Sequence, residues 1–145
     1  MRKLLTLTVA LFVIVSCSEM TKEVKQEIEV TEVEKPAAPE VQLNDGERWI
    51  ANQATVEGIE NLSVMVSRFD PSDQSYDSLQ SNLRDEFGLI FKNCTMKGEA
   101  HEQLHNYLLP LMELFGKLTL GDREKTLAEI KVHLARFDTY FVAEA

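Results

Sequence analysis

Apolar side chains recur at intervals of three and four residues along the second two-thirds of the chain. This spacing puts them on one face of an α-helix, and about three of every seven positions are apolar, as expected of a helix that buries one side. No alternating pattern typical of a β-strand interrupts it. The spacing predicts four helices, over about residues 52–69, 72–93, 97–118 and 122–142.

Short polar connections separate these stretches and predict how the helices are joined. Asn52 is a candidate N-cap of the first helix, and Trp49 before it is expected to cover one end of the core. Pro71 suits the first position of the second helix. Pro110 is expected to kink the third helix, because proline removes a backbone hydrogen bond. Since short connections favour antiparallel neighbours, we predict an all-α fold, an up-down-up-down four-helix bundle over residues 46–145.

The stretch before the bundle has a different composition. Residues 18–45 hold eight acidic and three basic residues, two prolines and a single leucine. Low hydrophobicity combined with excess negative charge is typical of chains that stay disordered. We therefore predict that residues 17–45 form a flexible acidic linker that holds the bundle away from its attachment point.

The first sixteen residues have the organisation of an export signal. Arg2 and Lys3 give a positive start, and Leu4–Val15 is an apolar run of about a dozen residues. A membrane-spanning helix needs about 20 apolar residues, so this run is too short to be one. Residues 1–16 are therefore predicted to be a secretory signal peptide.

The end of that signal carries a more specific feature. Ile14-Val15-Ser16-Cys17 resembles the lipobox of bacterial lipoproteins. The resemblance implies that the Cys17 thiol carries a diacylglycerol, that the mature chain begins at Cys17, and that acyl chains hold it in a membrane. Ser18 follows, where an aspartate would resemble an inner-membrane retention signal, so the implied location is the outer membrane of a bacterial envelope.

Charge narrows the choice of partners. The whole chain has a formal charge of −9, and loss of Arg2 and Lys3 with the signal makes it −11. A basic surface that tracks phosphates is the usual mark of nucleic-acid binding, and this composition argues against one. Contact with the membrane is therefore expected through the lipid on Cys17.

The side chains most capable of chemistry concentrate in one short stretch. Cys94, Met96, His101 and His105 lie within twelve residues. Cys94 continues the buried stripe of the second helix, and the two histidines are four apart, so they point the same way from the third helix. Because Cys17 is assigned to the lipid, Cys94 has no partner in the chain, which is unusual in an exported protein. All four side chains are expected to converge at one end of the bundle.

A thiolate, a thioether and two imidazoles form a four-coordinate set of soft and borderline ligands. Such a set suits Cu(I), and less exclusively Cu(II) or Zn²⁺. Zinc is the second choice, because its protein sites use cysteine, histidine and carboxylate and not methionine. The sequence therefore predicts a metal site, with copper preferred, at Cys94, Met96, His101 and His105.

Each of these residues also has a structural interpretation. Cys94 could be a small buried hydrophobe, Met96 could close the loop over the core, His101 could be a hydrogen-bonded core histidine, and His105 could face solvent. Two hypotheses follow. In the first, a lipid-anchored envelope protein binds copper for sequestration or handover, without catalysis. In the second, a structural or partner-binding lipoprotein binds no ligand, and its partner is another protein or a second copy of the chain.

The same stretch carries a second resemblance. Cys94 to His105 reads C-T-M-x-G-x-A-H-x-x-L-H and is followed by a helix rich in leucine, and Gly46-Glu47-Arg48-Trp49 precedes the first amphipathic helix. Over roughly residues 43–118 this resembles small uncharacterised exported helical proteins of Bacteroidota-type bacteria. The resemblance implies a helical domain and that source, and it implies no activity.

Other cofactor chemistry is less well supported by the sequence. A c-type haem needs C-x-x-C-H, which is absent, and a non-covalent haem between Met65 and His133 rests on position alone. His133 is about 17 Å along its helix from Asp122, whereas His101 is only about one turn into its own helix, so we leave His133 out. Glu102-x-x-His105 fits one half of a di-iron motif, without a second copy. A histidine that activates Cys94 as a nucleophile is conceivable, but no other enzyme signature accompanies it.

Overall fold

A computed structural model describes residues 39–145, which belong to one compact unit, 36–145. The predicted signal peptide, Cys17 and most of the predicted linker lie outside the described residues. Helices dominate the described part, so the predicted all-α class is confirmed in its main feature. The elements in chain order are β1 (Trp49–Ala51), α1 (Gln53–Arg68), α2 (Tyr76–Asn93), α3 (Gly98–Lys117), α4 (Arg123–Leu134), α5 (Phe137–Tyr140) and β2 (Phe141–Ala143).

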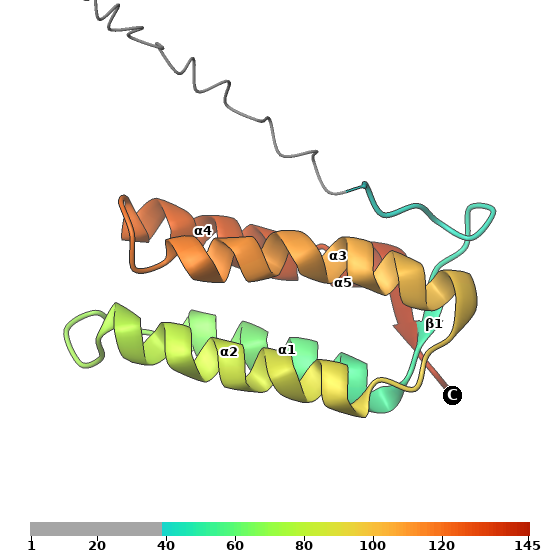
Figure 1. Cartoon of the computed structure of the whole chain (residues 1–145), viewed down its shortest axis with the longest axis horizontal. Coiled ribbons are helices and arrows are strands. Elements are labelled where there is room, and N and C mark those ends of the chain that lie inside the picture. Colours follow the sequence, from blue (N-terminus) through green and yellow to red (C-terminus); the bar gives the residue numbers. More distant parts are fainter. Residues whose placement is uncertain (1–38) are drawn as a thin grey trace, which may run out of the picture. The chain divides into compact units, whose positions relative to one another are not determined.

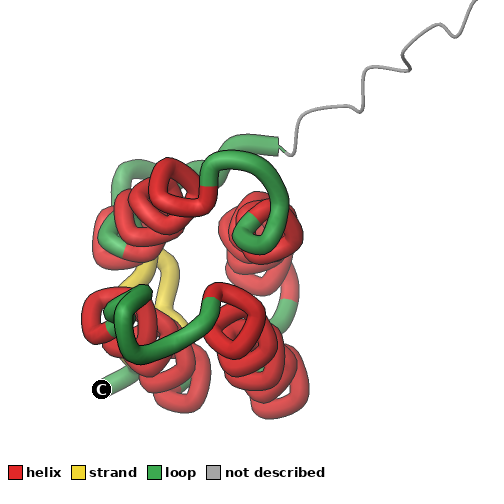
Figure 2. The backbone as a smooth tube through the Cα atoms, turned by 90° about the vertical axis from the view of Figure 1, so that its left-hand side faces the viewer, coloured by secondary structure: helices red, strands yellow, loops and turns green. Residues whose placement is uncertain are grey.

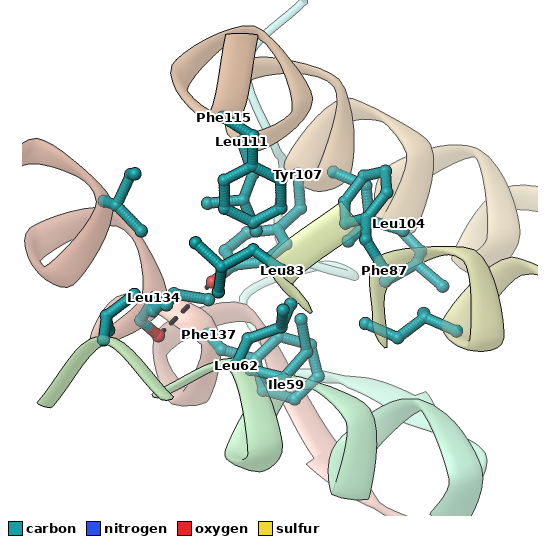
Figure 3. Close-up of a cluster of buried hydrophobic side chains, with 14 of the residues drawn as sticks. Ile59, Leu62, Leu83, Phe87, Leu104, Tyr107, Leu111, Phe115, Leu134 and Phe137 are labelled. Atoms are coloured by element: carbon teal, nitrogen blue, oxygen red, sulfur yellow. Dashed lines mark hydrogen bonds between the residues drawn. The ribbon is translucent and has the colours of Figure 1, made fainter. Parts of the chain in front are cut away.

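The four longer helices of the described part run alongside one another (Figure 1), and the end-on view shows them around a common centre (Figure 2). The helix α1 contacts α2 and α4, and α3 contacts the same two helices. The centre is filled by side chains from all of them, most of which are completely buried (Figure 3). In residues 39–145, none of the helices has the length and the apolar content that crossing a bilayer requires.

The connection between α1 and α2 differs from the prediction. Pro71 does not begin a helix, because residues 71–74 form a turn in which the Asp70 carboxylate accepts the Ser72 backbone N–H at 2.8 Å. The helix α2 begins after Ser75, whose hydroxyl caps it by accepting the N–H of Ser78 at 3.1 Å. A proline suits a first helical turn, but the serine cap that follows it determines the actual start.

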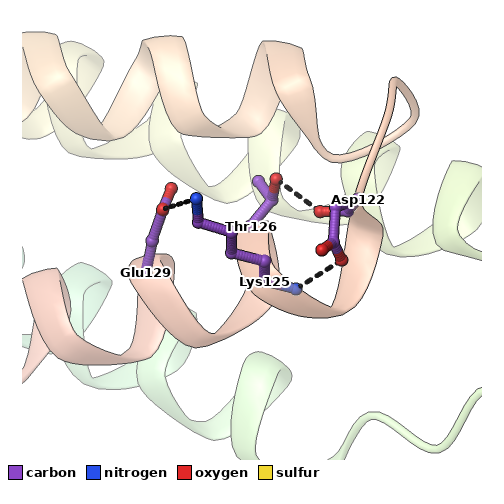
Figure 4. A network of polar contacts seen from close by, with 4 residues as sticks. All are labelled: Asp122, Lys125, Thr126 and Glu129. Atoms are coloured by element: carbon purple, nitrogen blue, oxygen red, sulfur yellow. Dashed lines mark hydrogen bonds and ion pairs between the residues drawn. The ribbon is translucent and has the colours of Figure 1, made fainter.

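The joint before α4 is where the sequence indicated it. Gly121 has φ +65°, a backbone conformation that glycine adopts without strain. Asp122 is the N-cap, and its carboxylate accepts the Lys125 N–H at 3.0 Å while its carbonyl accepts the Thr126 hydroxyl at 2.9 Å (Figure 4). Lys125 and Glu129 add an exposed ion pair at 4.0 Å, a contact of small energetic weight.

The last predicted helix, over 122–142, is interrupted after residue 134 and ends too late. The helix α4 ends at Leu134, one short turn follows as α5, and residues 141–143 form the strand β2. This strand pairs in parallel with β1, with Trp49 opposite Phe141 and Ala51 opposite Ala143. The prediction of no strands is therefore also wrong. Trp49 is buried against the core, as expected of a residue that covers its end.

The end of the predicted linker lies against the helical unit. The Gln42 backbone N–H donates to the Gln103 side chain at 2.7 Å, and the Trp49 indole donates to the Gln42 carbonyl at 2.6 Å. Asp45 and Gly46 both have positive φ, 50° and 91°, and they turn the chain back towards β1. This Asp-Gly pair is the composition that a two-residue turn of this kind requires.

Candidate metal centre

The four predicted ligands lie around the connection between α2 and α3. Cys94 directly follows the last residue of α2, Met96 is in the loop 94–97, and His101 and His105 are in the first two turns of α3. The loop is short, so the residues on either side of it must lie close together. Of the four side chains predicted to converge at this end of the helices, Cys94 contacts His101, and His101 contacts His105.

Asn52 holds this connection in place from the start of α1. Its side chain is buried, and its amide nitrogen donates to the carbonyl of Asn93 at 3.2 Å. Its amide oxygen accepts the Thr55 hydroxyl at 2.7 Å and, at 3.5 Å, the Thr95 N–H. Asn52 was predicted as an N-cap, and it occupies that position, but its side chain makes no capping hydrogen bond. It ties the loop that carries Cys94 to α1 instead.

Gly98 sets the direction in which α3 leaves the loop. Its φ of +59° lies in the left-handed region, where a side chain would be strained. The turn at Gly98 allows α3 to begin immediately, so that His101 and His105 lie in its first two turns. A substitution at this glycine would therefore shift both imidazoles relative to Cys94.

The thiol and the two imidazoles form a continuous row. The Cys94 Sγ lies 3.6 Å from His101 Nδ1, and His101 Nε2 lies 3.0 Å from His105 Nε2. The two rings are inclined at 61° to each other, with centroids 4.5 Å apart. His101 is the central member, and it uses a different ring nitrogen for each neighbour. All three side chains are half-buried.

The 3.0 Å contact constrains protonation. One of the two nitrogens must donate a proton and the other must accept it, so two imidazolium ions are disfavoured here. Burial lowers the pKa of His105, and the charge on a protonated His101 lowers it further. The Phe91 ring lies edge-on to His105, with centroids 5.4 Å apart, and contributes to this loss of water.

The observed geometry suits coordination of one metal ion by His101 and His105 better than coordination by all four predicted ligands. If a metal formed bonds of about 2.0 Å to both Nε2 atoms at their observed separation of 3.0 Å, the N–metal–N angle would be roughly 100°. That angle fits tetrahedral or tetragonal geometry. Cys94 faces the other nitrogen of His101, so a third bond to the same ion needs a side-chain reorientation. Consistent with this, residues 39–145 contain no group of three or more His, Cys, Asp or Glu side chains placed to hold one ion.

Met96 is placed differently from the other three predicted ligands. It is half-buried and packs against the hydrophobic core. Within the described residues, no hydrogen bond or ring contact joins it to either imidazole. The structure therefore brings together Cys94, His101 and His105, and it gives Met96 the loop-closing position that the sequence offered as the alternative.

Two contributors to the site were not among the predicted ligands. Phe91 borders His105, and Asn52 fixes the loop through contacts with residues more than forty positions away. Phe91 falls outside the apolar stripe of α2, which is the one sequence signal that it does something other than fill the core, and in the structure it is 40% exposed. Asn52 carries no such signal, because its partners are backbone groups distant in the chain.

Comparison of the chain with protein-family models, with curated proteins and with solved structures finds no match. The function is therefore argued from the residues and their geometry.

Proposed function

We propose that this chain is a lipoprotein of a bacterial cell envelope, anchored in the outer membrane through Cys17, whose helical domain binds a copper ion for sequestration or handover. Zinc is the second choice of metal, and we assign no catalysis. The anchor is supported by the resemblance of Ile14-Val15-Ser16-Cys17 to a lipobox. The acidic composition of the stretch that follows supports a linker between the lipid and the domain.

The metal assignment rests on one observation, the unbroken row of Cys94 Sγ, His101 and His105 with contacts of 3.6 and 3.0 Å. Thiolate and imidazole are ligands that copper prefers over oxygen donors. The His101–His105 pair is the starting point of the site, and Cys94 joins by a side-chain rotation. Met96 is the fourth ligand of the proposal and has to leave its position against the core to take part.

For the domain we propose the up-down-up-down bundle. Support comes from the contacts of α1 with α2 and α4 and of α3 with the same two helices, which close a ring of four neighbours. Short connections between consecutive helices support it as well, because they leave little length for a crossover.

The test is competition for Cu(I) against a chelator under reducing conditions. The protein is the full chain with Cys17→Ser, which cannot be lipidated and keeps Cys94 as its one thiol, in mild detergent. We expect one-to-one binding that weakens at least tenfold in His101→Ala and in Cys94→Ser. Loss of a residue that only orients a metal ligand already weakens binding about tenfold or more, and loss of the ligand itself should cost at least as much. His133→Gln is the matched control, because it removes a histidine elsewhere and should leave the affinity unchanged.

Two outcomes would count against copper binding: no competition by a folded protein, or equal affinity in all variants. In that case the partner-binding alternative is favoured by a specific observation. Four large apolar side chains on α2 and α3 remain 38–47% exposed, namely Leu89, Phe91, Leu109 and Met112. Exposed apolar side chains of this kind are candidates for contact with another protein or a second copy of the chain.

A further inference from the structure

A hollow lies beside α3, and Asn106 is one of its lining residues. It is bounded by residues 39–41, by α3, and by the chain around the end of α4 and α5, and its volume is about 240 Å³. This is room for about eight waters at ≈30 Å³ each, or for one small organic molecule. Its lining residues are in part charged and in part apolar, and none of them is a predicted metal ligand.

Two opposite charges line this hollow without neutralising each other. Glu40 and Arg136 both line it, and within residues 39–145 neither takes part in an ion pair. The Arg136 guanidinium donates to the Tyr140 hydroxyl at 2.8 Å and lies over the Tyr140 ring, 5.7 Å from its centroid. These contacts hold the guanidinium at the wall and leave further N–H groups for a bound anion.

The backbone supplies an additional acceptor at the same place. Pro110 has no N–H, so the Asn106 carbonyl lacks the partner that a helix normally provides four residues on. Asn106 and Pro110 both line the hollow. A carbonyl without its helical partner is a favourable acceptor for a ligand ammonium group, and Glu40 lines the same hollow.

The remaining lining is apolar. Val41, Pro110 and Tyr107 contribute carbon surface, and His133, whose Nε2 donates to the Tyr107 carbonyl at 2.8 Å, also lines the hollow. A ligand with a short apolar body and two opposite charges would therefore match this lining.

We propose that this hollow binds a small zwitterion of the α-amino acid class. Its carboxylate pairs with Arg136 and the Tyr140 hydroxyl, its ammonium group with Glu40 and the Asn106 carbonyl, and its side chain contacts Val41 and Pro110. This site is independent of the proposed metal centre, because it shares none of the residues Cys94, Met96, His101 and His105.

Titration calorimetry on the full chain with Cys17→Ser, in mild detergent and with a metal chelator present, tests the assignment. The probes are L-leucine, L-glutamate and L-lysine, together with N-acetyl-leucine, which lacks the ammonium group, and leucinamide, which lacks the carboxylate. We expect at least one free amino acid to bind. Blocking either charge of leucine, if leucine binds, should weaken it at least tenfold, as expected for loss of a charge-assisted contact.

Variants locate the binding. Arg136→Gln and Glu40→Gln should each reduce the affinity at least tenfold, and the matched controls Arg68→Gln and Glu60→Gln, on exposed positions of α1, should not. Because Arg136 and Glu40 are exposed, their variants should keep the wild-type circular dichroism and melting temperature. The proposal is overturned if no probe binds at concentrations up to about 10 mM, beyond any useful affinity. It is also overturned if N-acetyl-leucine binds as well as leucine, or if Arg136→Gln binds normally.

Discussion

His133, His101 and His105 are all half-buried, but they have different kinds of partner. His133 donates to a backbone carbonyl, that of Tyr107, at 2.8 Å. The Tyr107 hydroxyl in turn donates to the carbonyls of His133 at 3.0 Å and Leu134 at 3.3 Å. His101 lies instead between a thiol and a second imidazole, both of which exchange protons and bind metals.

Burial alone therefore does not distinguish a structural histidine from a reactive one. A carbonyl only accepts, so it fixes the tautomer of His133 and makes this residue a connection between α3 and α4. Each side chain of the Tyr107–His133 pair bonds to the backbone of the other, and burial raises the pKa of Tyr107 far above its usual value, which keeps it a donor. The row from Cys94 to His105 has no such fixed direction, so protons can be redistributed along it.

The largest expected difference between the two regions is in stability. His133→Ala removes the hydrogen bond to Tyr107 and a ring contact with a centroid separation of 4.6 Å, and should lower the free energy of unfolding by about 2 kcal/mol. His105→Ala, whose partner is another mobile side chain, should cost less than about 1 kcal/mol. Urea unfolding of the full chain, with a metal chelator present, measures the loss of stability in both variants.

A double-mutant cycle with Tyr107→Phe sharpens this comparison. Because Tyr107 and His133 contact each other, the losses in His133→Ala and Tyr107→Phe should not add. Equal costs for His133→Ala and His105→Ala would contradict the distinction between a structural and a reactive histidine.

A smaller effect is expected in the pH dependence of stability. Burial lowers the pKa of His133, the hydrogen bond to Tyr107 opposes this, and Arg136 adds to the lowering. The unfolded chain then binds the proton more readily, so stability is complete above the unfolded pKa of about 6.5 and is lost as the pH falls through the folded value. His133→Gln should reduce this loss.

His105 contributes a loss of stability of the same sign, because its pKa is also lowered. The contribution of His133 is therefore the difference between the wild type and His133→Gln. Glu40 lines the same hollow as His133 and Arg136, so the variant Glu40→Gln should be measured beside them. If stability fell equally with pH in the wild type and in His133→Gln, the protonation of His133 would carry no cost in the fold.

The helices could be predicted because their signal is local. The apolar spacing in 52–69 and 97–118 matches α1 and α3 to within one residue at each end. The pairing of β1 with β2 could not, because it joins positions 92 apart, as for Trp49 and Phe141, and each strand is three residues long. Phe137 and Phe141 are four apart and fit a helical stripe equally well, which explains why the fourth helix was predicted too long.

The candidate site shows the same limit. The four-residue spacing of His101 and His105 and the position of Cys94 at the end of the α2 stripe predicted that these side chains meet. The nitrogen that each contact uses depends on ring orientation, which no spacing encodes, and it decides whether three ligands share one ion. The role of Asn52 in holding the loop could not be predicted for a similar reason, since its side chain contacts the backbone of Asn93 and Thr95.

The smallest effect we expect is in the reactivity of the thiol. His101 Nδ1 lies 3.6 Å from Cys94 Sγ and is placed to accept its proton when the sulfur is alkylated, because the thiolate is the reacting species. In the chelated full chain with Cys17→Ser, iodoacetamide should modify Cys94 about two- to fivefold more slowly in His101→Ala than in the wild type, a modest general-base effect.

His133→Gln should leave the alkylation rate unchanged, since His133 donates to Tyr107 and does not contact the thiol. Alkylation in denaturant serves as the reference, and there all variants should react at one rate because the row of contacts is gone. Equal native rates in the wild type and His101→Ala would mean that the imidazole only packs against Cys94. The contrast between His133 and the His101–His105 pair would then be one of location, not of chemistry.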